Sequence, residues 1–125
     1  MTKSFIPAAA LILGLATVAC GKAARTTETF TGTVTAQAPD SHTIAVAAEG
    51  EVDAMLSSTD PAVAVGLGIG QPAADGSCAL LTTNTAATAG MTVSTEVQPG
   101  SYCVSVYDGG SFSGSVTYSV SVTHP

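Results

Sequence analysis

The chain has 125 residues and a formal net charge of −6, with nine acidic and three basic side chains. All three bases lie within the first 25 positions, so residues 26–125 contain no Lys or Arg. A domain without cationic side chains cannot neutralise phosphates, which excludes nucleic acid as a partner.

The first predicted element is an export signal at residues 1–19. Lys3 precedes the uncharged run 5–19, FIPAAALILGLATVA, which ends in small side chains. The run is shorter than the roughly 20 residues that a membrane-spanning helix needs, and its layout is typical of a secretory signal. The alternative, a buried N-terminal helix, would need a polar face that this run lacks.

The residues after the apolar run predict a lipid anchor. Thr17-Val18-Ala19-Cys20-Gly21 resembles the bacterial lipobox, although Thr17 stands where an aliphatic residue is usual. The resemblance implies lipid on Cys20, a tether at 20–27 and a domain held at the cell envelope, periplasmic or extracellular. Each buried CH₂ of an acyl chain adds roughly 0.8 kcal/mol to such anchoring. An ordinary signal peptidase cutting after Ala19 would instead give a freely secreted or periplasmic protein.

The cysteine count agrees with an exported protein. If Cys20 carries lipid, the remaining Cys78 and Cys103 are free to pair, which an oxidising compartment favours. The bridge would close a loop of about 25 residues, which the chain-entropy model values at roughly 3.5 kcal/mol. A redox-active or metal-binding pair is the alternative, and the wide separation without His partners disfavours it.

Residues 28–125 are predicted to form one all-β domain. Apolar residues alternate with Thr and Ser, and clusters of Pro, Asp, Asn and Gly separate the runs. The expected strands lie at 30–36, 44–48, 52–56, 63–69, 78–83, 91–97, 102–106 and 116–122, with loops at 71–77, 84–90 and 108–114. About eight such strands predict an antiparallel two-sheet β-sandwich, jelly-roll-like, with one face of each sheet buried.

Several of these stretches also carry a family pattern. They are 30–34 (FTGTV), 41–46 (SHTIAV), 48–52 (AEGEV), 97–107 (VQPGSYCVSVY) and 116–122 (VTYSVSV). Together they resemble the bacterial pre-peptidase C-terminal domain, a β-sandwich appended to secreted enzymes, and small lipoproteins built from this domain alone. The resemblance implies an accessory or binding domain. Ala62 and Ala64 stand where members of this family often have acidic residues, so a ligand role for those acids is not implied here.

The densest acidic group is Glu49, Glu51 and Asp53. Carboxylate oxygens suit calcium, especially if Asp40 or Asp108 came near. On a strand, however, Glu51 and Asp53 would share a solvent-facing side, and a solvated edge beside a turn explains them without an ion. No cofactor is expected.

Two glycine-containing patterns have structural interpretations. Gly66-Leu-Gly-Ile-Gly70 lacks the spacing of a phosphate loop, so the alternating glycines are expected to let another segment pack closely on one face of a strand. Asp75-Gly76 and Asp108-Gly-Gly110 are expected to be turns, in which Asp binds its own backbone and Gly supplies positive φ.

Catalysis is disfavoured by the residue inventory. Only His42 and His124 could act as an imidazole base, and the penultimate His124 is expected to be frayed. No GxSxG elbow marks a serine as a nucleophile.

Sugar binding would need exposed aromatic rings. The chain has no Trp, and the best candidates are Tyr107 and Phe112. Tyr107 alternates with Val104 and Val106, which places it on the outer face of its strand together with Cys103. We therefore expect the disulfide to pin a surface segment instead of filling the core.

The sequence thus predicts a non-catalytic cell-envelope lipoprotein, an interaction or structural module whose partner is an envelope protein or glycan. The alternative is an accessory carbohydrate- or substrate-binding domain that serves a separate secreted hydrolase. The uncharged stretches 62–69 and 115–123 lack the Lys that commonly blunts sheet edges. If either lies at an edge, a partner's strand could pair with it.

Overall fold

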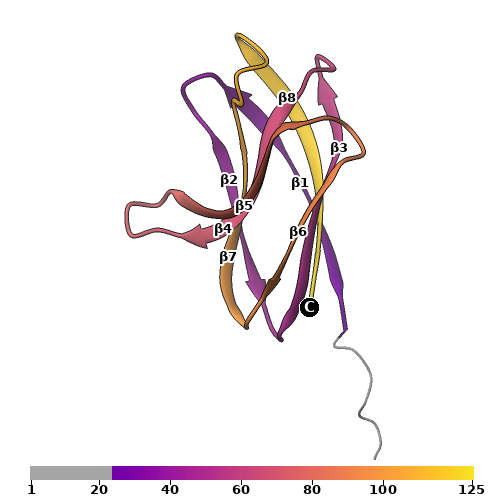
Figure 1. Cartoon of the computed structure of the whole chain (residues 1–125), viewed down its shortest axis with the longest axis vertical. Coiled ribbons are helices and arrows are strands. Elements are labelled where there is room, and N and C mark those ends of the chain that lie inside the picture. The colour runs from indigo at the N-terminus through magenta and orange to yellow at the C-terminus, as the bar shows by residue number, and fades with distance from the viewer. Residues whose placement is uncertain (1–23) are drawn as a thin grey trace, which may run out of the picture.

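The computed structural model describes residues 24–125, which form a sandwich of two antiparallel sheets (Figure 1). The strands are β1 (Thr26–Thr35), β2 (Asp40–Val46), β3 (Gly50–Asp60), β4 (Val65–Pro72), β5 (Cys78–Ala87), β6 (Thr92–Val97), β7 (Gly100–Tyr107) and β8 (Ser115–His124). The predicted fold class is confirmed. The predicted signal and Cys20 lie outside the described residues, and β1 begins at Thr26, inside the stretch expected as a tether.

The strand order is 1-8-3-6 in one sheet and 2-7-4-5 in the other. Successive strands mostly cross between the sheets, and within the described chain only β4 and β5 form a hairpin inside one sheet. This order is that of a jelly roll. No helix capable of crossing a membrane occurs among residues 24–125.

The core lies between the sheets and follows the predicted period of two. Every second residue of each central strand points inward, as in Val52, Ala54 and Leu56 of β3 or Val65, Leu67 and Ile69 of β4, all with no exposed surface. The opposite face of the β1–β8–β3–β6 sheet carries mainly Thr and Ser. Small β-branched side chains fill the thin space between two stacked sheets, so the domain needs few large residues.

One expectation about strand limits is wrong, and the condition set for pairing with a partner's strand is not met. The expected loop 84–90 is strand as far as Ala87, because two bulges keep β5 paired with β4 to the pair Val65–Ala87. The uncharged stretches 62–69 and 115–123 are not edges either. They form β4 and β8, which have neighbours on both sides, whereas β1, β6, β2 and β5 are the edge strands.

Candidate functional site

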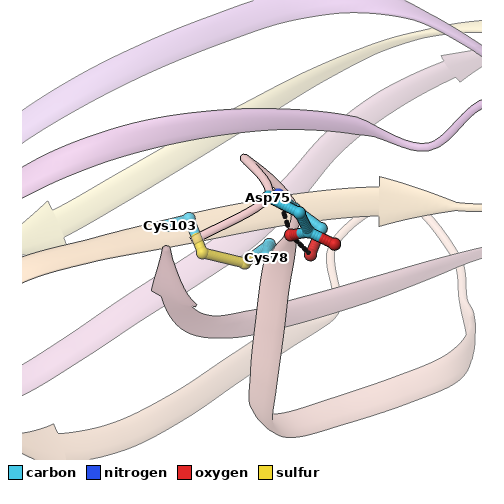
Figure 2. The surroundings of a disulfide bond; sticks show 4 residues. Asp75, Cys78 and Cys103 are labelled. Atoms are coloured by element: carbon cyan, nitrogen blue, oxygen red, sulfur yellow. Dashed lines mark hydrogen bonds between the residues drawn. A yellow bond between two sulfur atoms is a disulfide. The ribbon is translucent and has the colours of Figure 1, made fainter. Parts of the chain in front are cut away.

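The predicted disulfide joins Cys78, at the start of β5, to Cys103 in β7 (Figure 2). The S–S distance is 2.06 Å and the Cα atoms are 5.9 Å apart. Cys103 alternates with the core residues Tyr102 and Val104, so it lies on the outer face as expected. It is nevertheless only 3% exposed, with Cys78 at the start of β5 bonded to it. The bridge therefore fastens the start of the edge strand β5 to β7 on the outer side of the sheet.

The glycine stripe of β4 explains how the hairpin comes so close. A Cβ at Gly66 would overlap the ring of Tyr107, and a Cβ at Gly68 would lie 2.8 Å from Leu80. At Gly70 the obstacle is the main-chain carbonyl of Ala79. Only hydrogen at these positions leaves room for β5 and Tyr107 to cover β4, which confirms the structural interpretation of this motif.

The two Asp-Gly sequences are turns, as predicted. Asp75 Oδ1 accepts hydrogen bonds from the backbone and hydroxyl of Ser77, at 3.0 and 2.6 Å, and these bonds lower the pKa of Asp75 (Figure 2). Asp108 Oδ1 accepts from the backbone N–H of Gly110 at 2.7 Å. Gly76 and Gly110 have φ of 89° and 97°, so glycine relieves strain at both positions.

Neither predicted sugar-binding aromatic presents a free ring. Tyr107 lies on the outer face, but its ring covers Gly66 and its hydroxyl is hydrogen-bonded to Thr83 Oγ1. Phe112 is half-buried and packs against the core. Both residues are partly exposed, and each ring also packs against the protein's own strands.

The acidic candidates gather at one end of the sandwich. Glu49, Glu51, Asp53 and Glu96 line a hollow of about 450 Å³ together with Arg25, Gly50 and Pro125. Glu51 of β3 lies directly opposite Glu96 of β6. The negative charge of Asp53 and its hydrogen bond raise the pKa of Glu51, with smaller contributions from burial and Glu96.

Two of the four carboxylates of this end, Asp53 and Glu49, accept hydrogen bonds from other side chains. Asp53 accepts from Ser94 at 2.6 Å through Oδ1 and from Arg25 at 2.9 Å through Oδ2. Glu49 accepts from Gln98 at 3.0 Å. Within residues 24–125, no three His, Cys, Asp or Glu side chains are grouped so as to hold a metal ion. The calcium candidates thus lie near one another, and the carboxylates of Asp53 and Glu49 are hydrogen-bonded to other side chains.

A second polar cluster lies between the edge strands β1 and β2. The hydroxyl of Tyr118 donates to Asp40 Oδ2 at 2.6 Å and lies 2.6 Å from Nε2 of His42. Because the phenol has a single proton and gives it to Asp40, its oxygen accepts from His42, which identifies Nε2 as a protonated nitrogen. The His42 ring stacks on Phe30, with centroids 4.6 Å apart. Desolvation raises the pKa of Tyr118, and the hydrogen bond and charge of Asp40 raise it further, so the phenol stays neutral.

The expectation that His124 is frayed is wrong. His124 is only 4% exposed. Its Nε2 lies 2.6 Å from Glu28 Oε2, and its Nδ1 lies 3.0 Å from the carbonyl oxygen of Pro125. The ring is held because His124 continues the inward parity of Val120 and Val122 in β8. Asp40 and His42 likewise fall on the same side of β2 as the buried Ile44 and Val46. This alternation in the sequence could have revealed that both polar side chains face inward.

Arg25 makes contacts that the sequence pattern does not reveal. Its guanidinium donates to the carbonyl of Glu51 at 2.9 Å, to Asp53 at 2.9 Å and to the carbonyl of Thr123 at 3.3 Å. No pattern in the sequence links position 25 to β3 and β8, because these contacts span at least 26 residues.

Solved structures share this fold. The pre-peptidase C-terminal domain of collagenase from Bacillus anthracis aligns with a TM-score of 0.56 and 19% identity, over 76% of this chain and 87% of that chain. The Yersinia pseudotuberculosis-derived mitogen aligns with a TM-score of 0.54 and 16% identity, over 78% and 83%. No protein-family profile and no curated protein matches the sequence. The likeness confirms the fold that the resemblance to the pre-peptidase C-terminal domain implied.

Proposed function

We propose that the chain is a non-catalytic lipoprotein of the cell envelope, in which the sandwich acts as an interaction or structural module. The observation that carries the non-catalytic part is the use of both histidines. His42 stacks on Phe30 and binds the neutral phenol of Tyr118, and His124 is enclosed beside Glu28. Among the described residues, neither imidazole stands next to a serine or cysteine that it could activate.

The cysteines support the anchor. Cys78 and Cys103 bind each other, and the third cysteine of the sequence, Cys20, lies outside the described residues. An exported protein whose remaining thiol sits at a lipobox-like sequence has a chemical use for that thiol. The lipid then holds the sandwich at the membrane surface.

Mass spectrometry of the mature protein from a bacterial host tests the anchor. We expect an N-terminal Cys20 whose mass is increased by acyl chains, and recovery of the protein in the detergent phase. The matched control is Cys20→Ser, which should remain soluble with its disulfide intact. An unmodified wild-type N-terminus, or equal partitioning of both proteins, would refute the proposal.

One comparison favours a second function. The similar Bacillus anthracis domain belongs to a collagenase, which is consistent with an accessory substrate-binding role for such sandwiches. Binding of the mature chain to a glycan array and to fibrous collagen would test this role. Selective binding that Tyr107→Ala abolishes, while Tyr102→Phe retains it, would favour the accessory role over the structural one.

A further inference from the structure

The structure fixes the point where the chain enters the sandwich. The Arg25 guanidinium makes three hydrogen bonds, two to β3 and one to β8, and its side chain is 32% exposed. Bonds to carbonyls and to a carboxylate on two strands hold the side chain in one place. Position 25 is therefore attached to one end of the domain and does not swing freely.

This end is built from segments distant in sequence. The backbone N–H of Ala47 donates to the carbonyl of Pro125, and Gln98 binds Glu49 across two turns. Figure 1 shows the start of β1 and the C-terminal residue at the same end, and the turns before β2, β4 and β8 at the opposite one. We call the first the Arg25 end; its outward carboxylates are Glu49, Glu51, Asp53 and Glu96.

Chain length limits how the domain can lie if Cys20 carries lipid, which is the function proposed above. Four residues lie between Cys20 and Arg25, and the five Cα–Cα steps from one to the other reach at most about 18 Å when fully extended. The ten residues of β8 span about 31 Å, since each antiparallel residue advances about 3.4 Å. The tether is thus shorter than the sandwich, which excludes an inverted domain whose opposite end lies on the membrane while the Arg25 end points away from it.

We propose that the Arg25 end faces the lipid headgroups, and that the surface it fits is a zwitterionic one whose outermost groups are ammonium cations. Four carboxylates lie at this end, and the charge of Arg25 is directed at Asp53. The raised pKa of Glu51 reflects how closely the negative charges are crowded. Anionic headgroups would repel this end, whereas choline or ethanolamine groups offer it a compensating charge. The opposite end is then presented to partners.

Carboxyl footprinting tests the orientation with side chains that the protein already has. The mature chain is coupled through the Cys20 thiol to maleimide phospholipid in phosphatidylcholine vesicles, and carbodiimide labelling is followed residue by residue by mass spectrometry. We expect Glu49 and Glu96 to be labelled at least about twofold more slowly than in the uncoupled protein, because solvent and reagent are excluded at close contact. Asp60, at the opposite end, and Asp75, in the β4–β5 hairpin, should keep their rates. Protection of Asp75 would mean that the domain lies on its side with Leu80 and Leu81 in the membrane, and would overturn the proposal, as would equal rates throughout.

The charge requirement has its own comparison. Adding phosphatidylglycerol should remove the protection of Glu49 and Glu96, and about 0.5 M salt should restore it, since the screening length then falls well below 10 Å. The control Glu51→Gln should lose less protection than the wild type on the same vesicles. Protection that is indifferent to phosphatidylglycerol would refute the zwitterionic preference.

Arg25→Ala tests whether the hydrogen bonds of Arg25, and not the tether alone, orient the domain. This variant remains coupled through Cys20, yet we expect the protection of Glu49 and Glu96 to fall toward that of Asp60. Unchanged protection would show that the Arg25 hydrogen bonds do not orient the domain. Maleimide coupling replaces natural lipidation, so the orientation can be measured even if the protein is not acylated in cells. Conversely, an acylated protein can fail the orientation test. The lipid anchor and the orientation are therefore tested independently.

Discussion

At the residue scale, the informative positions are polar side chains with core-facing parity. Asp40, His42 and Tyr118 join the two sheets along the side where β1 and β2 meet, and among the described residues no buried side-chain nitrogen or oxygen lacks a partner. Gly32 makes the cluster fit, since a Cβ there would overlap the carboxylate of Asp40. A satisfied polar network between sheets specifies one arrangement of the strands.

Tyr118→Phe tests this network. The variant removes the hydroxyl that bridges Asp40 Oδ2 and His42 Nε2, which lie 3.6 Å apart, so the free energy of unfolding near neutral pH should fall by about 1–2 kcal/mol. The pKa of Tyr118 is raised in the folded state, whereas the unfolded phenol ionises near pH 10. The phenol's contribution is therefore complete below about pH 10 and is lost as pH rises further, because only the unfolded state releases the proton.

Urea denaturation between pH 7 and 11 measures both effects. The wild type should lose stability above pH 10 more steeply than Tyr118→Phe. Tyr107→Phe is the matched control, since its hydroxyl binds Thr83 on the outer face, and it should keep the wild-type pH profile. Parallel curves for the wild type and Tyr118→Phe would contradict the assignment.

At the element scale, β4 is covered on both faces, which is unusual for a strand in a two-layer sandwich. Val65, Leu67 and Ile69 point into the core, and the glycines between them receive Tyr107, Leu80 and the main chain of Ala79. The start of β5 thus packs closely against the outer face of β4, and Cys78–Cys103 fastens it to β7. The sequence indicated that Gly66, Gly68 and Gly70 allow close packing, but it did not show which segment would cover them.

Gly70→Ala and Gly66→Ala should differ in stability. At Gly70 a methyl group meets backbone, which cannot move without shifting β5, so we expect a loss of about 2–3 kcal/mol. At Gly66 it meets the Tyr107 ring, which can rotate away, and the loss should be about 1 kcal/mol. Thermal and chemical denaturation of the pair decide the matter. Equal losses would mean that β5 does not lie directly over Gly70.

At the scale of the whole molecule, stability comes from a thin core of small side chains and from one covalent link. The largest fully buried side chains are Ile, Leu and Val, and the charged groups gather mainly at the Arg25 end. A 25-residue disulfide loop restricts the entire unfolded ensemble, so its effect is global even though it pins one hairpin.

Removing the bridge should therefore lower the free energy of unfolding by about 3 kcal/mol in Cys78→Ala/Cys103→Ala. Denaturant titration with and without reductant measures this effect. The wild type should approach the variant once reduced, while the variant should not respond to reductant. A variant that unfolds at the wild-type denaturant concentration would show that the loop is already restricted without the bridge.

The sequence alone determined the fold class, most strand positions, the disulfide and the turns, because each depends on local alternation, on turn chemistry or on a count of cysteines. The period of two places Val52, Ala54 and Leu56 inward whichever strands lie beside them. The pairing of Cys78 with Cys103 followed from their number and not from any contact.

Only the tertiary structure decided which strands are edges, what covers the glycines, and where Arg25 and His124 bind. These are contacts across large sequence separations, such as the 98 residues between Arg25 and Thr123. The alternation of apolar and polar residues determines on which face of a sheet each side chain lies, but it carries no information about strand order. For that reason the sequence left β4 and β8 as possible edge strands. In the folded structure each of them pairs with a neighbouring strand on both sides.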